Sequence, residues 1–355
     1  MNNVCKIKMI KKALVTGSGG LLGFSVSQKF LSLGYIVNGM DINMREVLFG
    51  INGSVTSKIE KLSRNPLYNH IHQDVRDKKG VDCWIDRIRP DVIVHCASQP
   101  SHDWAATNPV MDFDINCNGT LNLLEAARSY CLDSPFIFIS SSKIYGSKIN
   151  EESYIEEEKR FTISNPLLSN GISETYYTDD VGIRSMFGAS KYAADIMVRE
   201  YGRYYNMPTV CLRSGCITGP NHAGVEQHGF LSYIVKCAKH NLPYKIYGYK
   251  GKQVRDNIHA NDLADAIIEI SQNPPKPGEI FNIGGGFDNS CSILEAIELL
   301  EGMAGKKMDV TYVEKERVGD HIFWISDMTK FKTHFLKWKQ KYSLVDTITE
   351  IYNKS

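Results

Sequence analysis

The run KKALVT at residues 11–16 is followed directly by GSGGLLG at residues 17–23 and then by an amphipathic run. This order predicts a strand, a tight glycine turn and a helix. Gly17 can adopt a positive φ at the end of the strand, Gly20 lets a pyrophosphate approach the backbone, and Gly23 lets the helix pack closely on the sheet. Unpaired N–H groups at the helix N-terminus would then face the phosphates. A plain loop is the alternative interpretation of an isolated glycine triplet.

An acidic residue stands where a dinucleotide-binding unit needs one. The second predicted strand, residues 35–40, ends at Asp41, and an acid about 20 residues beyond the last glycine can bind an adenosine ribose. The negative charge of Asp41 favours NAD over NADP, because it would repel a 2′-phosphate. Arg45 follows soon after and works against that preference.

Composition narrows the class of function. A chain of 355 residues is long for one average domain, so we expect one large core with a smaller lobe attached. The net charge of +1, without a basic block, argues against binding to nucleic acid or to a membrane surface. The nine cysteines include no C-x-x-C pair, which favours reduced, buried thiols. No apolar run approaches the ~18 residues of a membrane span, so we expect a cytoplasmic protein.

Strand and helix patterns alternate through the first half of the chain. Residues 91–97, 136–139 and 209–213 are apolar runs of the kind found in buried parallel strands, and helical patterns separate them. We therefore predict an α/β fold, a doubly wound parallel sheet (Rossmann fold), with a smaller C-terminal substrate-binding lobe.

The expected domain boundary is interleaved. The NAD-binding domain would take residues 1–214 plus about 256–286, and the substrate lobe would take about 215–255 and 287–355. Two connecting segments are given no regular helix: residues 41–66 are interpreted as an irregular insertion and residues 248–253 as a basic hairpin.

Several polar side chains follow predicted strands and are expected at the carboxyl edge of the sheet, where ligands bind in doubly wound folds. Asp74 could accept from an adenine amino group, or could be a turn or capping acid. His102 lies in the loop expected over the nicotinamide, with a structural hydrogen bond as the alternative role. Ser141 and Lys143 follow the fifth strand, although Lys143 could also be a solvated loop charge.

Lysine, cysteine and histidine side chains also have roles that do not involve this site, or other chemistries, to be considered. Lys191 and Asp195 are one helical step apart, so a surface ion pair is an alternative role for that lysine. Cys216 could be a nucleophile, but a free cysteine more often behaves as a small hydrophobe. The histidines, including His222 and His228, lack metal-ligand spacing, and we expect no metal site.

In this order, the glycine turn, Asp41, the serines at 140–142 and Lys191 resemble the extended short-chain dehydrogenase/reductase family, which contains nucleotide-sugar epimerases and dehydratases. The resemblance spans almost the whole chain and includes RDNIH at residues 255–259 and RVGD at residues 317–320. Within the family, QPSHDW at residues 99–104 and GKQVRD at 251–256, among other stretches, look most like the CDP-tyvelose (CDP-paratose) 2-epimerase branch.

The resemblance implies a bound NAD and a nucleotide-sugar substrate, with roles for particular residues. Ser141 would bond the reacting sugar hydroxyl, Lys191 would bond the nicotinamide ribose, and Phe187 stands at the third catalytic position. The implied cofactor-binding residues are Gly17, Gly20, Leu22, Gly23, Asp41, Arg45, Asp74, Val75, Ala97, Gln99, Asn116 and Lys191. The implied substrate-binding residues are His102, Lys143, Asn221, Arg255, Arg317 and Asp320, with the two arginines on the diphosphate and Asp320 on the nucleoside ribose.

One position departs from the family pattern. The family uses Tyr-x-x-x-Lys, and this chain has Phe187 four residues before Lys191. The phenol that would remove the substrate's hydroxyl proton is therefore absent, and an engineered change is one explanation. Lys191, Lys143, His102 and Glu174 are the candidate replacements, in that order. A catalytically impaired NAD-binding protein is the alternative from another class.

The resemblance also implies a homodimer. Family members commonly pair through two helices that here match about residues 118–129 and 187–205. Both carry apolar residues beyond one narrow stripe, including Tyr192, Ile196 and Val198, which is expected of helices with a second buried face.

Overall fold

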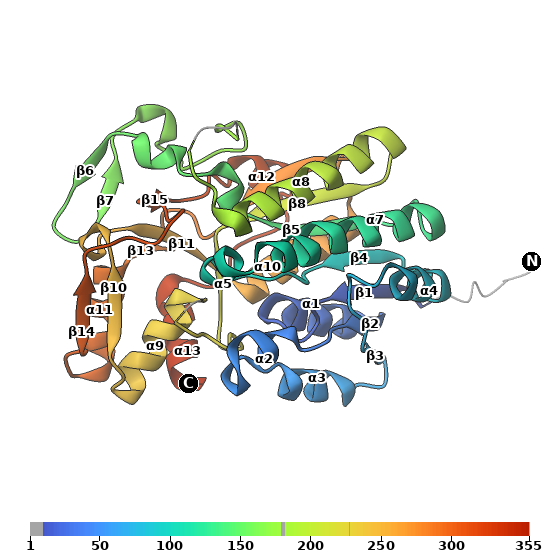
Figure 1. Ribbon diagram of the computed structural model, residues 1–355, viewed down its shortest axis with the longest axis horizontal. Helices are drawn as coiled ribbons and strands as arrows, with labels where there is room; N and C mark the ends of the chain where they lie inside the picture. Colours follow the sequence, from blue (N-terminus) through green and yellow to red (C-terminus); the bar gives the residue numbers. More distant parts are fainter. Residues whose placement is uncertain (1–9, 179–181, 227, 355) are drawn as a thin grey trace, which may run out of the picture.

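A computed structural model describes residues 10–178, 182–226 and 228–354. Its centre is a seven-stranded sheet in the order β12-β8-β5-β4-β1-β2-β3 (Figure 1), in which every pairing is parallel. The strands are β1 (Lys12–Thr16), β2 (Ile36–Met40), β3 (Tyr68–Ile71), β4 (Val92–His95), β5 (Phe136–Ser141), β8 (Thr209–Ser214) and β12 (Glu279–Ile283). The strand order reverses between β1 and β4, as in a Rossmann fold, so the predicted fold class is confirmed.

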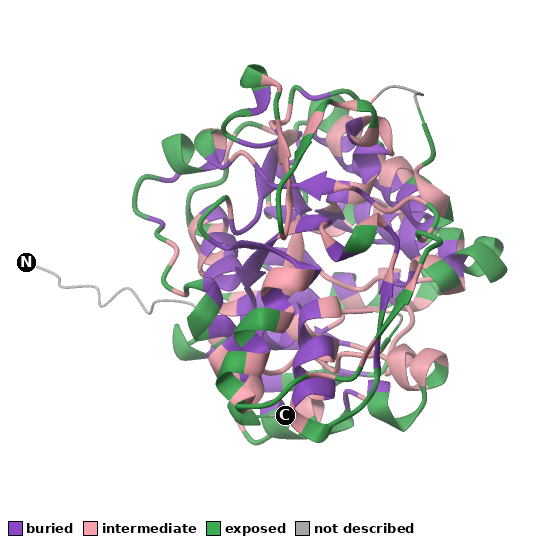
Figure 2. Ribbon diagram, turned by 90° about the vertical axis from the view of Figure 1, so that its left-hand side faces the viewer, coloured by how far each residue is buried: buried purple, intermediate pink, exposed green. Residues whose placement is uncertain are grey.

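Helices cover both faces of the sheet, because neighbouring strand residues point to opposite sides. Ala13 and Val15 belong to the hydrophobic cluster under α1 (Leu21–Ser32) and α10 (Ala260–Gln272). Leu14 belongs to the cluster on the other face, under three helices, which are α4 (Lys78–Ile88), α7 (Gly119–Tyr130) and α8 (Ser185–Tyr205). Figure 2 shows the buried residues concentrated in the strands and on the inner sides of these helices.

A third hydrophobic cluster lies outside the main sheet, at the left of Figure 1. It is built from α9 (Phe230–His240), α11 (Ile293–Ala304), α13 (Leu344–Lys354) and β10 (Tyr244–Tyr247), which pairs with β14 (Val310–Val313). A further sheet contains β9 (Cys216–Thr218), β11 (Val254–His259), β13 (Ser290–Ser292) and β15 (Phe323–Trp324), and a fourth contains β6 (Tyr154–Glu156) and β7 (Phe161–Ile163).

Short helices connect these layers. They are α2 (Met44–Phe49), α3 (Thr56–Ser63), α5 (His102–Thr107), α6 (Pro109–Phe113) and α12 (Thr329–His334), with 3-10 turns at Ile51–Gly53, Ser142–Tyr145, Lys148–Glu151, Pro166–Leu168 and Tyr249–Gly251. A π-helical turn, Asp114–Asn118, joins α6 to α7. Asn116 therefore lies in a π turn, a feature frequent at functional sites.

Two connecting segments differ from the sequence-based prediction. Residues 41–66 contain α2 and α3, with Leu62 buried in the core cluster under α1. Such short helices bury few side chains, so their sequence periodicity is weak. Residues 248–253 are not a hairpin, because β10 pairs with β14 whereas β11 belongs to another sheet.

The C-terminal part of the chain is shared between the layers. β12 pairs with β8 in the main sheet, and α10 packs against α1. Phe331 and Trp338, from the range assigned to the substrate lobe, join Phe281 in the core of the main sheet. Some segments of the expected substrate lobe thus pack in the core of the main sheet, and the division into two lobes stays a prediction.

Candidate active site

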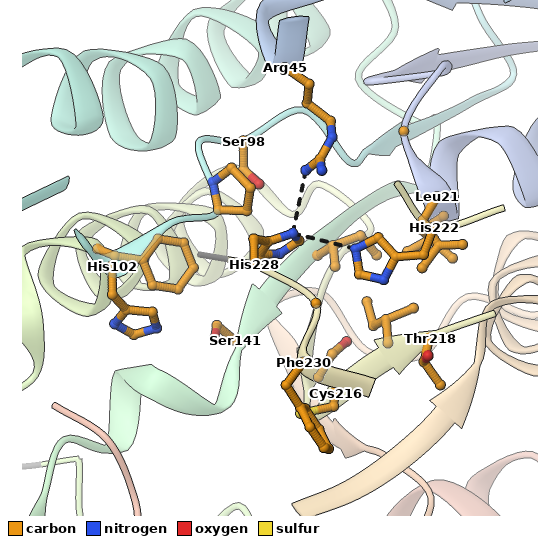
Figure 3. A pocket seen from close by; sticks show the side chains of 18 of the residues that line it. Leu21, Arg45, Ser98, His102, Ser141, Cys216, Thr218, His222, His228 and Phe230 are labelled. Carbon is orange, nitrogen blue, oxygen red and sulfur yellow. Dashed lines mark hydrogen bonds between the residues drawn. The ribbon is translucent and has the colours of Figure 1, made fainter. Parts of the chain in front are cut away.

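A cavity of about 480 Å³ opens at the carboxyl edge of the main sheet, within the range usual for ligand sites. Its lining begins with the glycine turn after β1 and includes residues that follow β2, β4, β5 and β8. Elements from outside the sheet, including β9 and α9, close the opposite wall. Figure 3 shows these side chains converging from several segments, with Leu21 and Arg45 on one side and Cys216 and Phe230 on another.

The glycine turn has the geometry expected of a phosphate-binding turn. Gly17 has a φ of +65°, and a Cβ on Gly23 would lie 2.1 Å from the Gly17 carbonyl oxygen. Gly20 is the N-cap of α1 and provides no side-chain cap, so the first N–H groups of α1 remain available to an anion. Gly17, Gly20, Leu22 and Gly23 all line the cavity.

Asp41 lies beside this turn. One carboxylate oxygen accepts from the Gly19 N–H at 2.9 Å and the other from the Asn43 N–H at 2.7 Å. A carboxylate has about four acceptor positions, so capacity remains for ribose hydroxyls. Arg45 lines the same part of the cavity and donates to the Ala223 carbonyl at 2.9 Å. Burial lowers the pKa of Arg45, and the negative charge of Asp41 opposes that shift.

Asp74, Val75 and Ala97 also reach the cavity wall. Asp74 forms an ion pair with Arg76 at 2.6 Å and accepts from its backbone N–H at 2.9 Å. Asp74 is thus a turn acid in contact with the cavity, and the two roles considered for it are compatible.

Four charged residues gather at another part of the cavity. Asp320 accepts from Arg255 and from the Lys143 Nζ, at 3.2 Å for the latter. Burial acts to raise the pKa of Asp320, but Arg255 and Lys143 hold it well below its usual range. Lys143 is therefore not a solvated loop charge. Arg317 lies over the Tyr247 ring, 4.5 Å from its centroid, and also lines the cavity.

The centre of the cavity carries the expected catalytic positions. Ser141, Phe187 and Lys191 all line it. The Lys191 Nζ donates to the Ile139 carbonyl at 2.6 Å, and burial lowers its pKa to about 8. The alternative of a surface ion pair with Asp195 is wrong, because Asp195 is buried and pairs with Arg213 at 2.8 Å.

Three expected ligand-binding residues do not line the cavity: Gln99, Asn116 and Asn221. Gln99 and Asn116 are buried behind its wall, where the Gln99 N–H donates to the Asn116 side chain at 2.9 Å. Asn116 also donates to Asp112 at 3.0 Å and to Ser190 at 3.0 Å. It therefore fixes the loop after β4 against α6 and α8 rather than facing a ligand.

Sequence reasoning missed Lys58 and gave no ligand role to His222 and His228, all of which line the cavity. Burial lowers the pKa of Lys58 to about 8. The two histidine rings meet with Nε2 of His222 and Nδ1 of His228 3.4 Å apart (Figure 3). The only signal for α3, and hence for Lys58, is the weak i, i+3 spacing of Ile59 and Leu62, and the two histidines lie in a loop without helical periodicity.

Comparison with known proteins assigns the family. A model of the NAD dependent epimerase/dehydratase family matches residues 13–284. The chain belongs to this family. It is also 32% identical to CDP-paratose 2-epimerase of Salmonella typhi over 349 residues, which cover 96% of this chain and 98% of that protein. A putative UDP-glucose 4-epimerase of Methanocaldococcus jannaschii is 28% identical, covering 96% and 97% of the two chains.

Solved structures of other proteins share the fold of this epimerase/dehydratase family member. The structure of Pal from Bacillus thuringiensis superposes with a TM-score of 0.78 at 25% identity, covering 97% of this chain and 98% of that one. The structure of UDP-glucuronic acid 4-epimerase from Bacillus cereus superposes with a TM-score of 0.79 at 24% identity, and again covers 97% of this chain and 98% of the other. These likenesses extend over both the main sheet and the elements outside it.

As a member of an NAD-dependent family, the protein uses NAD as its cofactor. The cavity fits this group, because the turn admits no Cβ at Gly23 and leaves the α1 N-terminus open beside Asp41. Two other chemistries lack a basis. Burial raises the pKa of Cys216 to about 11, which keeps it a thiol. Within the described ranges, no cluster of three or more His, Cys, Asp or Glu side chains could hold a metal ion.

Proposed function

We propose that this protein is an NAD-dependent nucleotide-sugar epimerase that inverts C2 of a CDP-linked hexose. The likeness to CDP-paratose 2-epimerase over 96% of the chain is the observation that carries the proposal. The cationic group formed by Arg255, Arg317 and Lys143 supports it, because guanidinium and ammonium groups suit a diphosphate.

In this proposal the two ends of the cavity hold different ligands. The glycine turn and Asp41 would hold NAD, whose chemistry is to accept the hydrogen of a carbinol carbon with its electron pair and to return it later. Arg255 and Arg317 would hold the substrate's diphosphate, and Asp320 would keep Arg255 and Lys143 oriented through the contacts described above. The Ser141 hydroxyl would bond the reacting sugar hydroxyl. Turning the keto sugar over before reduction would invert the carbon.

The purified protein should be incubated with a panel of CDP-, UDP- and dTDP-linked hexoses, and the products separated by chromatography. Inversion at C2 of a CDP-sugar is the expected result. Inversion at C4, or loss of water or carbon dioxide, would identify a 4-epimerase, dehydratase or decarboxylase instead. Binding without conversion of any sugar would identify a catalytically impaired NAD-binding protein, the alternative that Phe187 motivates.

A second experiment tests the chemistry. Because the same hydrogen leaves and returns, turnover in deuterated water should place no deuterium on the inverted carbon. Deuterium at that carbon would mean deprotonation at carbon and would rule out transient oxidation.

A further inference from the structure

The absence of a phenol at Phe187 leaves a proton-transfer role open, and one ring lies directly beside that position. The His102 and Phe187 rings are 4.9 Å apart between centroids, at an angle of 58°. Both side chains line the cavity, as does Ser141. Figure 3 labels His102 and Ser141 among the side chains of that lining.

A strained residue holds the imidazole in place. Nδ1 of His102 lies 2.9 Å from the Ser185 Oγ, which also accepts from the Gly188 N–H at 3.2 Å. Ser185 has a φ of +64°, in the left-handed region that serine seldom occupies. Such a conformation is unfavourable for a residue with a side chain and persists where the surroundings impose it. At Ser185 the strained backbone directs the hydroxyl onto the histidine.

The other ring nitrogen is available to a ligand. Within the described part of the chain, Nε2 of His102 has no hydrogen-bond partner. A neutral imidazole has one donor nitrogen and one acceptor nitrogen. In the tautomer whose Nδ1–H donates to Ser185, Nε2 carries the free lone pair on a ring that lines the cavity.

The other candidate bases are engaged elsewhere. The Lys191 Nζ donates into the sheet, to the Ile139 carbonyl, and lies 4.2 Å from the centroid of the Phe138 ring. The Lys143 Nζ donates to Gly319 and Asp320. Glu174 accepts from the Asn282 N–H at 2.6 Å and does not line the cavity.

We propose that Nε2 of His102 is the general base that replaces the missing phenol, with Ser185 as its positioning residue. The inference rests on the proposed epimerase function. The substrate's O–H bond would break and its proton would go to Nε2, while NAD, held by the glycine turn and Asp41, would supply the acceptor for the carbinol hydrogen together with its electron pair. On the return step the imidazolium gives the proton back to the same oxygen. Atoms and electrons therefore balance over the cycle.

The charges around His102 link its basicity to substrate binding. Burial, together with the positive charges of Lys143, Arg317 and Arg255, lowers the pKa of His102 to about 3, and the negative charge of Asp320 opposes that shift. His228 is a further titratable neighbour, and burial holds its pKa well below its usual range. A bound diphosphate would offset the three cations and so raise the pKa of His102. The base would then become effective when the substrate is present.

A double-mutant cycle with F187Y tests the proposal. In the background that carries Phe187, H102Q should lower kcat by about 10²–10⁴-fold, the usual contribution of a positioned base, with little change in KM. In the F187Y background, where the phenol is restored, H102Q should cost less than about tenfold. S185A should follow the same pattern with a smaller loss. H334Q, at an exposed histidine, is the control and should change neither background.

The results separate the two proposals. Equal losses from H102Q in both backgrounds would indicate a structural role and overturn the base assignment, as would an unaffected kcat in the Phe187 background. If neither the protein with Phe187 nor F187Y converted any nucleotide sugar, the proposed function itself would fail and the base assignment with it. Turnover by F187Y alone would overturn the base assignment and identify an impaired enzyme.

A titration provides a readout other than activity. The His102 imidazole resonance, assigned by its loss in H102Q, should be followed by NMR over pH with and without CDP. CDP should increase the proton affinity of His102 tenfold or more, and inorganic phosphate should do so less. An unchanged titration with CDP bound would contradict the electrostatic link between the base and the diphosphate.

Discussion

At the scale of single residues, the cavity contains two separate groups of charged side chains. Asp41 stands beside the glycine turn, whereas Arg255, Arg317 and Lys143 lie around Asp320. This separation lets changes at one end be measured without disturbing the other.

Replacing Asp41 should weaken the discrimination against NADP. D41N removes the charge that repels a 2′-phosphate, while Arg45 and Lys58 remain beside it as cations. The ratio of the NADP and NAD dissociation constants, measured by calorimetry, should fall by about tenfold, which corresponds to about 1.4 kcal/mol. D82N, at an acid in an exposed ion pair on α4, is the control. An unchanged ratio of the two dissociation constants would show that Asp41 does not contact the adenosine ribose.

Removing Arg317 should weaken nucleotide binding. Hydrogen bonds to charged groups contribute about 1.5–3 kcal/mol, so R317A should weaken CDP binding by about 10–100-fold and leave NAD content unchanged. R255A should act in the same direction, but it also removes the main partner of Asp320 and could lower stability. The melting temperature of R255A, measured without ligand, distinguishes a loss of stability from a loss of CDP binding. Loss of NAD from either variant would contradict the division of the cavity.

At the scale of elements, buried polar contacts fix α8 against the sheet. Asp195 on α8 pairs with Arg213 on β8 at 2.8 Å and accepts from the Ser140 hydroxyl on β5 at 2.7 Å. Both charged side chains are almost fully buried, with exposed fractions of 0% and 1%. Since α8 also carries Phe187 and Lys191, this network helps to position the catalytic centre.

Removing one partner of that ion pair should be severely destabilising. D195A leaves the Arg213 guanidinium buried without its carboxylate, and such losses cost about 3–5 kcal/mol. Denaturant unfolding should show this decrease. E200A, in an exposed pair with Arg203 on the same helix, should change stability by less than about 1 kcal/mol. Similar effects of the two substitutions would mean that the buried pair is not stabilising α8.

The glycine turn should be equally sensitive to a single methyl group. In G23A the new Cβ would lie 2.1 Å from the Gly17 carbonyl oxygen, so α1 must move away from the turn. We expect lost NAD and a lower free energy of unfolding. G302A in the exposed part of α11 meets nothing within 4 Å and should stabilise the protein by about 0.5–1 kcal/mol. Normal NAD content in G23A would contradict the close packing of α1.

At the scale of the whole molecule, we propose a homodimer through α7 and α8. Among the residues named for this face, Val198 is buried in the core of its own chain, Tyr192 is partly buried, and Ile196 is 38% exposed. Only Ile196 therefore offers a clearly exposed apolar contact, and Tyr204 and Tyr205 on α8 add to it. None of the helices in the described ranges is long and apolar enough to cross a membrane.

Light scattering at micromolar concentration should give twice the monomer mass. I196E should shift the protein toward monomer, because it places a charge in the proposed interface. L336E, at an exposed leucine elsewhere, should leave the mass unchanged. An unsubstituted protein that scatters only as a monomer would contradict the dimer.

The sequence by itself determined the parallel sheet, the glycine turn and the acid after β2. These features depend on local signals: buried strands read as continuous apolar runs, and a turn beside a phosphate requires glycine at fixed spacings. Phe187 was also visible in the sequence as a departure from the family pattern.

Only the tertiary structure decided which polar residues face the cavity. Asn116 and Gln99 stand near the correct strand end but bond to each other behind the wall, whereas His102 meets Phe187 and Ser185 across more than 80 positions of chain. Lys191 and Asp195 share a helix, yet one contacts β5 and the other pairs with β8. The side-chain partners come from long-range packing, which helical spacing and composition do not encode.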